Sequence, residues 1–222
     1  MTEDESAHAN LLRLGVYARP GLWLVIGISL AWTVAIVVAP LTIPPGKVVG
    51  LAGAANRVDY ASLWAQLPPA QGAVYYLGDV ECHQIASRTI FINGNEMPVC
   101  ARDASLFFFI TAGLVMAAVI KPDLAVSRAI VGMLPARLRK RLDKGARPLL
   151  FTWLLAFASV APLGVDGVMQ LVTPYESTNP VRFLTGVPAG VFLGLLIGLM
   201  IQSIHLIPSA RRLAQSEGRR VN

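Results

Sequence analysis

The stretch that decides the fold is Leu22–Ile43, LWLVIGISLAWTVAIVVAPLTI, which contains no charged residue. A helix of that length rises roughly 33 Å and crosses the ~30 Å hydrocarbon core of a bilayer. The run is longer than the apolar region of a secretory signal peptide, and Glu3, Asp4 and Glu5 stand where a signal peptide carries basic residues. We therefore expect a permanent membrane-spanning helix rather than a cleaved leader.

Three further apolar runs follow, over residues 104–120, 149–171 and 183–207. Across the whole chain 55% of residues are hydrophobic and only 14% are charged, whereas soluble domains average about 25% charged residues. These features predict an all-α membrane protein, a small bundle of about four transmembrane helices in one domain over residues 22–207. A short arm (1–21) and a basic tail (208–222) flank this domain, and an outer loop (44–103) and an inner loop (121–148) connect its helices.

Basic residues are distributed unequally between the connecting segments. The arm, the inner loop and the tail hold 14 of the 19 lysines and arginines, and the segments on the other side hold 5. The positive-inside rule then places both chain ends in the cytoplasm, N-in and C-in. Because the basic residues flank apolar runs and do not alternate with base-stacking aromatics, we expect membrane lipids and no nucleic acid as partners.

Two connecting segments have an intermediate character. Residues 61–77 are moderately apolar but contain Pro68-Pro69, so they predict an outer interfacial or re-entrant segment. A fifth spanning helix is the alternative, and it would move the N-terminus to the outside. Residues 124–142 mix apolar residues with the basic cluster Arg137–Arg141, which predicts an amphipathic helix on the inner leaflet.

The last apolar run carries a ladder of glycines at four-residue spacing: Gly186, Gly190, Gly194 and Gly198. Residues spaced by four lie nearly on one face of a helix, and small side chains on such a face let a neighbouring backbone come close. The ladder predicts tight helix packing within the bundle. Contact with a second copy of the chain is the alternative.

Polar residues gather near the predicted outer ends of the last two helices. Asp166 lies at membrane depth in the third run, where a charged side chain is costly unless it is paired, and Gln170 follows one turn later. Glu176 and Arg182 flank the start of the fourth run. Asn179 precedes Pro180, a pair that predicts a helix start with Asn179 as its N-cap.

The outer loop contains both cysteines of the chain, Cys82 and Cys100. A structural disulfide is one interpretation, and closing an 18-residue loop would stabilise the fold by about 3 kcal/mol. A zinc or iron site is the second: Cys82, Cys100 and Asp103 offer ligands together with His83, Asp166 or Glu176. A redox role is the third, although no C-x-x-C motif is present.

Four ordered strings carry a family resemblance. They are CHQIASRTIFING from Cys82, MPVCARD from Met97, VDGVMQ from Val165 and ESTNPVRFLTG from Glu176. Together they resemble the domain-of-unknown-function 2085 family of prokaryotic integral membrane proteins over roughly residues 75–200. The family pattern reads C-A-R-C where this chain has Cys100-Ala-Arg-Asp103, so a carboxylate replaces one thiol.

The resemblance implies that one outer-face site is built from a set of polar residues. Its members are Cys82, His83, Gln84, Arg88, Cys100, Arg102, Asp166, Gln170, Glu176, Asn179 and Arg182, and Asp103 stands in the position of the missing thiol. The resemblance implies no particular reaction.

The leading expectation is a multi-pass membrane protein with a metal- or ligand-binding site at the outer face. A membrane-embedded hydrolase or a quinone or thiol oxidoreductase acting on a lipid-like substrate is one alternative, although no H-E-x-x-H motif is present. Transport would require a homo-oligomer, since four helices form a thin pathway. A structural or assembly subunit with a membrane-complex partner is the last alternative.

Overall fold

The computed structural model describes residues 20–54 and 57–218, with side chains described as far as residue 207. The chain folds as two compact units. We call residues 28–111 and 160–190 the hairpin unit, and residues 20–27, 112–159 and 191–218 the basic-loop unit. Each long helix contributes one part to each unit. The predicted arm (1–21) lies almost entirely outside the described residues.

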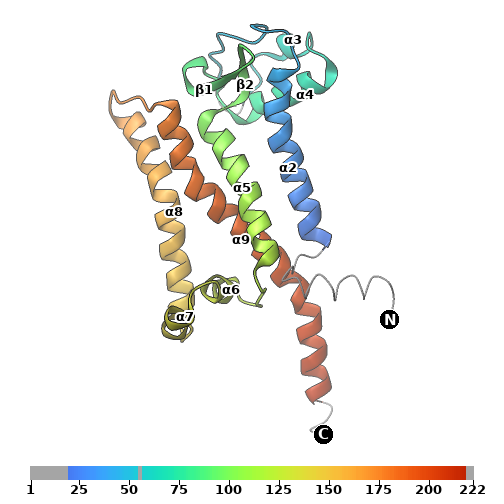
Figure 1. Cartoon of the computed structure of the whole chain (residues 1–222), viewed down its shortest axis with the longest axis vertical. Coiled ribbons are helices and arrows are strands. Elements are labelled where there is room, and N and C mark those ends of the chain that lie inside the picture. The colour runs from blue at the N-terminus through green and yellow to red at the C-terminus, as the bar shows by residue number, and fades with distance from the viewer. Residues whose placement is uncertain (1–19, 55–56, 219–222) are drawn as a thin grey trace. The chain divides into compact units, whose positions relative to one another are not determined.

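Four helices are long and apolar enough to cross a membrane, which confirms the predicted fold class. They are α2 (Pro20–Leu41), α5 (Ala101–Val119), α8 (Arg147–Val172) and α9 (Asn179–Gly218) (Figure 1). The first three lie within three residues of their predicted ranges. The described part of the chain thus contains four candidate spans, and residues 61–77 are not among them.

Helix α9 is longer than predicted at both ends. The prediction ended it at residue 207 because Pro208 follows, but the helix continues to Gly218. Proline removes the hydrogen bond that its own N–H would donate and crowds the carbonyl one turn back, but a long apolar helix can continue past it. The helix passes through Pro188 in the same way. Residue 207 therefore marks the end of the apolar run, and the candidate span is Asn179–Ile207.

In the basic-loop unit, two short helices replace the single amphipathic helix predicted over residues 124–142. They are α6 (Val126–Gly132) and α7 (Ala136–Leu142). Pro135 separates them, because proline disfavours helical geometry in the residue before it. Helix α6 buries its apolar side, whereas α7 buries no residue. Gln202 Nε2 of α9 donates to the Ala117 carbonyl of α5 at 2.5 Å, so these helices are also joined by a polar contact.

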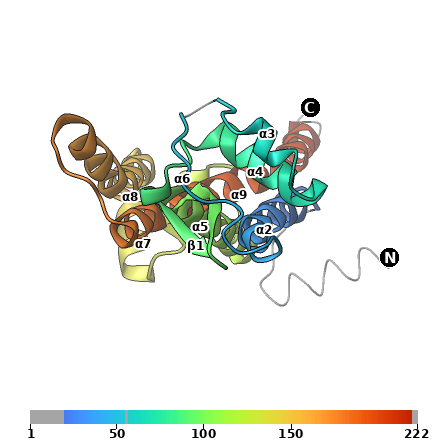
Figure 2. The ribbon, with the colours of Figure 1, turned by 90° about the horizontal axis from the view of Figure 1, so that it is seen from above.

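In the hairpin unit, the predicted outer loop is a folded structure, called here the hairpin cap (residues 48–54 and 57–100). It contains α3 (Ala61–Trp64), α4 (Pro69–Glu81), the 3-10 turn η1 (Ala86–Arg88) and the antiparallel pair β1 (Thr89–Ile92) and β2 (Asn95–Cys100). Seen from above, α3 and α4 lie side by side (Figure 2). Helix α4 has 13 residues, about 20 Å at 1.5 Å per residue, which is too short to span a bilayer.

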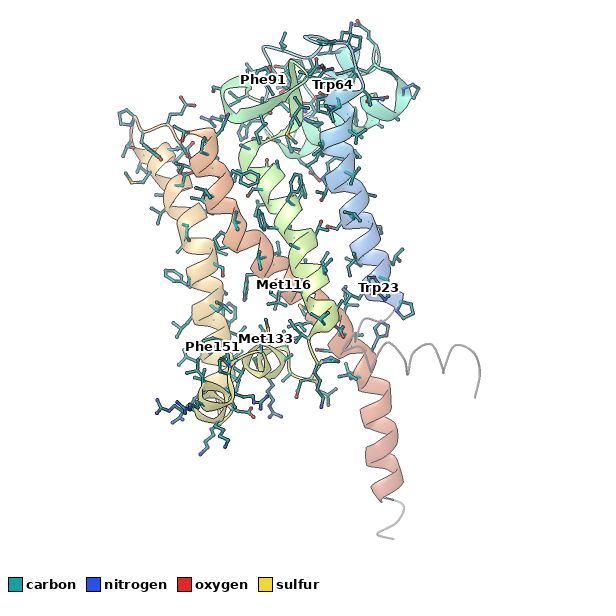
Figure 3. The ribbon with its side chains drawn as sticks, viewed as in Figure 1. Trp23, Trp64, Phe91, Met116, Met133 and Phe151 are labelled. Carbon is teal, nitrogen blue, oxygen red and sulfur yellow. The ribbon has the colours of Figure 1, made fainter. Side chains whose placement is uncertain are left out.

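An aromatic pair and one amide organise the hairpin cap. The rings of Trp64 and Tyr75 stack with their centroids 4.9 Å apart, and both side chains are buried. Figure 3 labels Trp64 inside the cap and Phe91 on the hairpin. Asn95 Nδ2 donates to the carbonyls of Pro40 and Pro44 at 3.0 and 3.1 Å, so β2 is tied to the end of α2.

Glycines of the ladder pack against α5 within the chain. A Cβ at Gly190 would lie 2.8 Å from Phe109 Cβ and 2.9 Å from the Leu106 carbonyl oxygen in the hairpin unit. In the basic-loop unit, a Cβ at Gly198 would meet Ala117 of the same helix α5. Gly190 and Gly198 therefore lie against α5 within the chain.

Candidate metal centre and polar network

Three side chains that can bind metal meet where the hairpin cap joins α5. Cys82 directly follows α4, Cys100 is the last residue of β2, and Asp103 lies in the first turn of α5. Their thiol and carboxylate atoms all lie within 4.8 Å of one another. The Cys100 N–H donates to Cys82 Sγ at 3.3 Å, and the Cys100 thiol donates to Asp103 Oδ2 at 3.1 Å. We call these three residues the Cys-Cys-Asp group.

The two thiols differ in acidity. The hydrogen bond from the Cys82 thiol lowers the pKa of Cys100, although burial and the negative charge of Asp103 oppose this shift. The same hydrogen bond, followed by burial, raises the pKa of Cys82. Cys100 is therefore the more acidic thiol of the pair. A thiolate is the form in which cysteine binds metal or acts as a nucleophile.

His83, a predicted ligand, is exposed and does not belong to the group. Cys82 has extended backbone geometry (φ −122°, ψ 151°), so consecutive side chains point to opposite sides and a buried Cys82 turns His83 outward. Gln84 adopts a left-handed conformation (φ 45°) and is buried. Its Nε2 donates to the Pro98 carbonyl at 2.9 Å, so Gln84 holds the hairpin cap together.

A polar network joins three helices beside this group. Arg102 of α5 forms an ion pair with Asp166 of α8, and Gln170 Nε2 donates to Asp166 Oδ2 at 3.0 Å. Gln170 Oε1 accepts from Arg182 of α9 at 2.8 Å, and Arg182 Nε donates to the Ser177 carbonyl at 2.9 Å. Asp166 and Arg182 are only 6% and 3% exposed. Because a buried charge without a partner is costly, Asp166 needs its ion pair with Arg102, and Arg182 needs its hydrogen bonds.

Glu176 contributes at the exposed edge of the network. Its Oε1 lies 3.5 Å from Arg88 Nε and 3.8 Å from the nearest Arg182 nitrogen, and its side chain is 60% exposed. At such distances and exposure each ion pair is weak. Glu176 therefore adds a counter-charge for two arginines but does not fix their positions.

The predicted N-cap role of Asn179 is wrong, although α9 does begin at this residue. Asn179 Nδ2 donates to the Thr89 carbonyl of β1 at 2.7 Å, and its Oδ1 has no partner among the described residues. The side chain reaches β1 across 90 positions of sequence, which local helix-start rules cannot anticipate. Asn179 thus connects the start of α9 to the hairpin cap.

Sequence reasoning missed two buried acids in the hairpin cap. Asp79 Oδ2 accepts hydrogen bonds from Trp64 Nε1 at 2.8 Å and from the backbone N–H of Asp59 and Tyr60. Glu96 accepts from the Leu51 N–H at 3.2 Å, and burial raises its pKa. The sequence did contain a signal for the hairpin that includes Glu96. Asn93-Gly94 stands between two short apolar runs, which strongly indicates a tight turn.

Comparison with known proteins agrees with this architecture. A family model described as "Predicted membrane protein (DUF2085)" matches residues 82–197, more than half of the chain. Uncharacterized protein MJ1492 of Methanocaldococcus jannaschii is 34% identical over 130 residues, which cover 59% of this chain and 67% of the relative. An uncharacterised protein of Methanothermobacter thermautotrophicus is 29% identical over 115 residues, covering 52% of this chain and 82% of the relative.

No solved structure matches the chain. The matched region begins at Cys82 and includes the Cys-Cys-Asp group, the polar network and the first three glycines of the ladder. The predicted resemblance is thereby confirmed. This chain belongs to the DUF2085 family of membrane proteins.

Proposed function

We propose that this membrane protein binds one transition-metal ion, zinc by preference, at Cys82, Cys100 and Asp103. The observation that carries the proposal is the convergence of two thiols and one carboxylate within 4.8 Å. Two sulfur ligands and one oxygen ligand form a donor set that suits zinc, at about 2.3 Å for sulfur and about 2.0–2.2 Å for oxygen.

Three protein ligands leave a fourth coordination position for water or an external ligand, as in catalytic zinc sites. A bound ion supplies a Lewis acid there. The chain's own contribution is to lower the pKa of Cys100, to bury Cys82, and to fix the Arg102 side chain through its ion pair with Asp166.

We further propose that the group faces the outside of a prokaryotic plasma membrane. The excess of basic residues in the inner loop and the tail supports this orientation. Both relatives named above come from archaea, which supports a prokaryotic location.

The test is the metal content of the purified chain. We would purify the untagged protein in detergent from cells grown with added zinc and iron, and measure metal per chain by elemental mass spectrometry. We expect about one ion per chain, lost in Cys82→Ser and Cys100→Ser. The matched control is His83→Ala, which changes an exposed neighbour outside the group and should retain the ion.

The same proximity also supports a structural disulfide between Cys82 and Cys100, and the experiment separates the two. If the wild-type protein carries no metal and intact mass shows two fewer hydrogens until it is reduced, the metal proposal is wrong. The pair is then a brace between α4 and the start of α5. That outcome favours a structural or assembly role over a hydrolase or an oxidoreductase.

A further inference from the structure

The basic-loop unit contains a cavity of about 450 Å³ that the metal proposal does not use. It lies between the end of α5, the loop that follows it, and helices α6 and α7. Figure 3 labels Met133, which lines it from α6, and shows nitrogen-tipped side chains spreading from the adjacent α7. We call it the basic cavity.

Three cationic side chains line the basic cavity: Lys121, Arg128 and Arg139. Asp123 is the one acid in the lining, and it is already engaged, since its Oδ1 accepts from the Ala125 N–H at 2.9 Å. No ion pair with these three cations is found among the described residues, where the paired arginines are all in the hairpin unit. The cavity therefore presents a net positive charge of about two.

The rim of the cavity is apolar. Val119 and Met133 both line it, and they are 59% and 41% exposed. Val119 is also the last residue of a candidate membrane span. Leu124, in the following loop, is 56% exposed. A free phosphate would satisfy only the cations, whereas an amphiphile satisfies both the cations and the exposed apolar side chains.

We propose that the basic cavity is a binding site for the headgroup phosphate of an anionic phospholipid, with the acyl region against Val119 and Met133. Guanidinium groups of Arg128 and Arg139 suit the phosphate oxygens through paired N–H donors, and Lys121 adds a point charge. Basic pockets beside membrane helices bind anionic headgroups by the same chemistry. This proposal is independent of the metal site, which lies in the other unit.

The test is a lipid titration of the full chain in detergent, followed by native mass spectrometry, with phosphatidylglycerol compared against phosphatidylcholine. We expect one phosphatidylglycerol molecule to bind per chain, in preference to phosphatidylcholine. The double variant Arg128→Gln/Arg139→Gln should weaken its binding roughly 25-fold, since each cation near a membrane surface contributes about fivefold. The matched control is Arg137→Gln/Arg141→Gln, which removes the same charge from exposed residues of α7 that do not line the cavity.

Binding that falls in the cavity variant and stays within about twofold of wild type in the control supports the site. Equal losses in both variants would mean that the whole basic surface attracts lipid, and would overturn it. Equal binding of the two lipids would also overturn it. Glycerol phosphate at millimolar concentration distinguishes the sources: if it displaces the lipid fully, the cavity is a soluble-phosphate site and the lipid proposal is wrong.

Discussion

At the scale of single residues, Cys82 and Cys100 differ in acidity. The pKa of Cys100 is lowered by the Cys82 thiol and that of Cys82 is raised. In metal-depleted protein, the midpoint of Cys100 alkylation should therefore lie at lower pH than that of an ordinary cysteine. Cys82 should react slowly at every pH, because it is both buried and protonated. Iodoacetamide labelling across pH, followed by peptide mass spectrometry, measures both rates.

The Asp103→Asn variant extends this test. The negative charge of Asp103 and its hydrogen bond from the Cys100 thiol both raise the pKa of Cys100. Removing the charge should move the alkylation profile of Cys100 to still lower pH. A profile that moves upward would contradict the assigned contacts, and resistance of both thiols to alkylation before reduction would reveal a disulfide.

Asp166→Asn tests the polar network at the same scale. The substitution leaves the Arg102 guanidinium without its counter-charge beside a 5% exposed side chain. We expect a loss of about 3 kcal/mol in the free energy of unfolding, the cost of breaking a buried ion pair. Thermal unfolding in detergent, followed by tryptophan fluorescence, measures it.

The control for Asp166→Asn is Glu176→Gln, because that carboxylate is 60% exposed. We expect it to cost less than about 1 kcal/mol. Equal effects of the two variants would mean that the network acts through surface charge. A stable Asp166→Asn protein would show that Asp166 is not required for folding and would leave it a role in binding alone.

At the scale of elements, the contact between α5 and α9 depends on glycine. A methyl group at Gly190 would lie 2.8 Å from Phe109 Cβ and 2.9 Å from a backbone oxygen, so the helices must separate. Gly190→Ala should cost about 1–3 kcal/mol, the range for overpacking. Gly164→Ala in α8 is the control, since nothing lies within 4 Å of its added methyl group. Denaturation by sodium dodecyl sulfate compares them, and equal tolerance would contradict the packing.

The hairpin cap should respond to pH through Glu96. Burial raises the pKa of this carboxyl above its unfolded value of about 4.3, and hydrogen bonds from the backbone of Leu51 and Gly50 offset only part of the shift. Its contribution to stability is therefore present below the unfolded pKa and is lost as pH rises through the folded pKa. Glu96→Gln should have a melting temperature that varies less between pH 4 and 8 than wild type. If the melting temperatures of wild type and Glu96→Gln change in parallel with pH, Glu96 is not the titrating group.

At the scale of the whole molecule, the testable property is orientation. Phe91 on β1 and Arg141 on α7 are both exposed, and the sequence predicts that they lie on opposite sides of the membrane. In intact cells, a membrane-impermeant maleimide should label Phe91→Cys at once and Arg141→Cys only after lysis. The wild-type chain is the blank for its two native thiols. The reverse pattern would invert the topology and place the Cys-Cys-Asp group in the cytoplasm.

The sequence by itself determined the spans, because apolar length is read locally and a bilayer requires about 20 apolar residues. It also determined the contact face of α9, since helical periodicity alone aligns Gly186 to Gly198. The Cys100–Asp103 pair followed from the family resemblance, in which Asp103 takes the place of a thiol. Each of these properties depends on residues within one or two turns of each other.

Tertiary structure alone decided the rest. The fold of the hairpin cap depends on contacts such as Asn95 with Pro40, 55 positions apart, and Asn179 with Thr89, 90 positions apart. His83 lies outside the Cys-Cys-Asp group because the backbone is extended at Cys82 and the side that carries Cys82 is the buried one. Asp79 and Glu96 look like surface acids until the chain folds around them. Such pairings are selected by the free energy of the closed fold, and no local pattern carries that information.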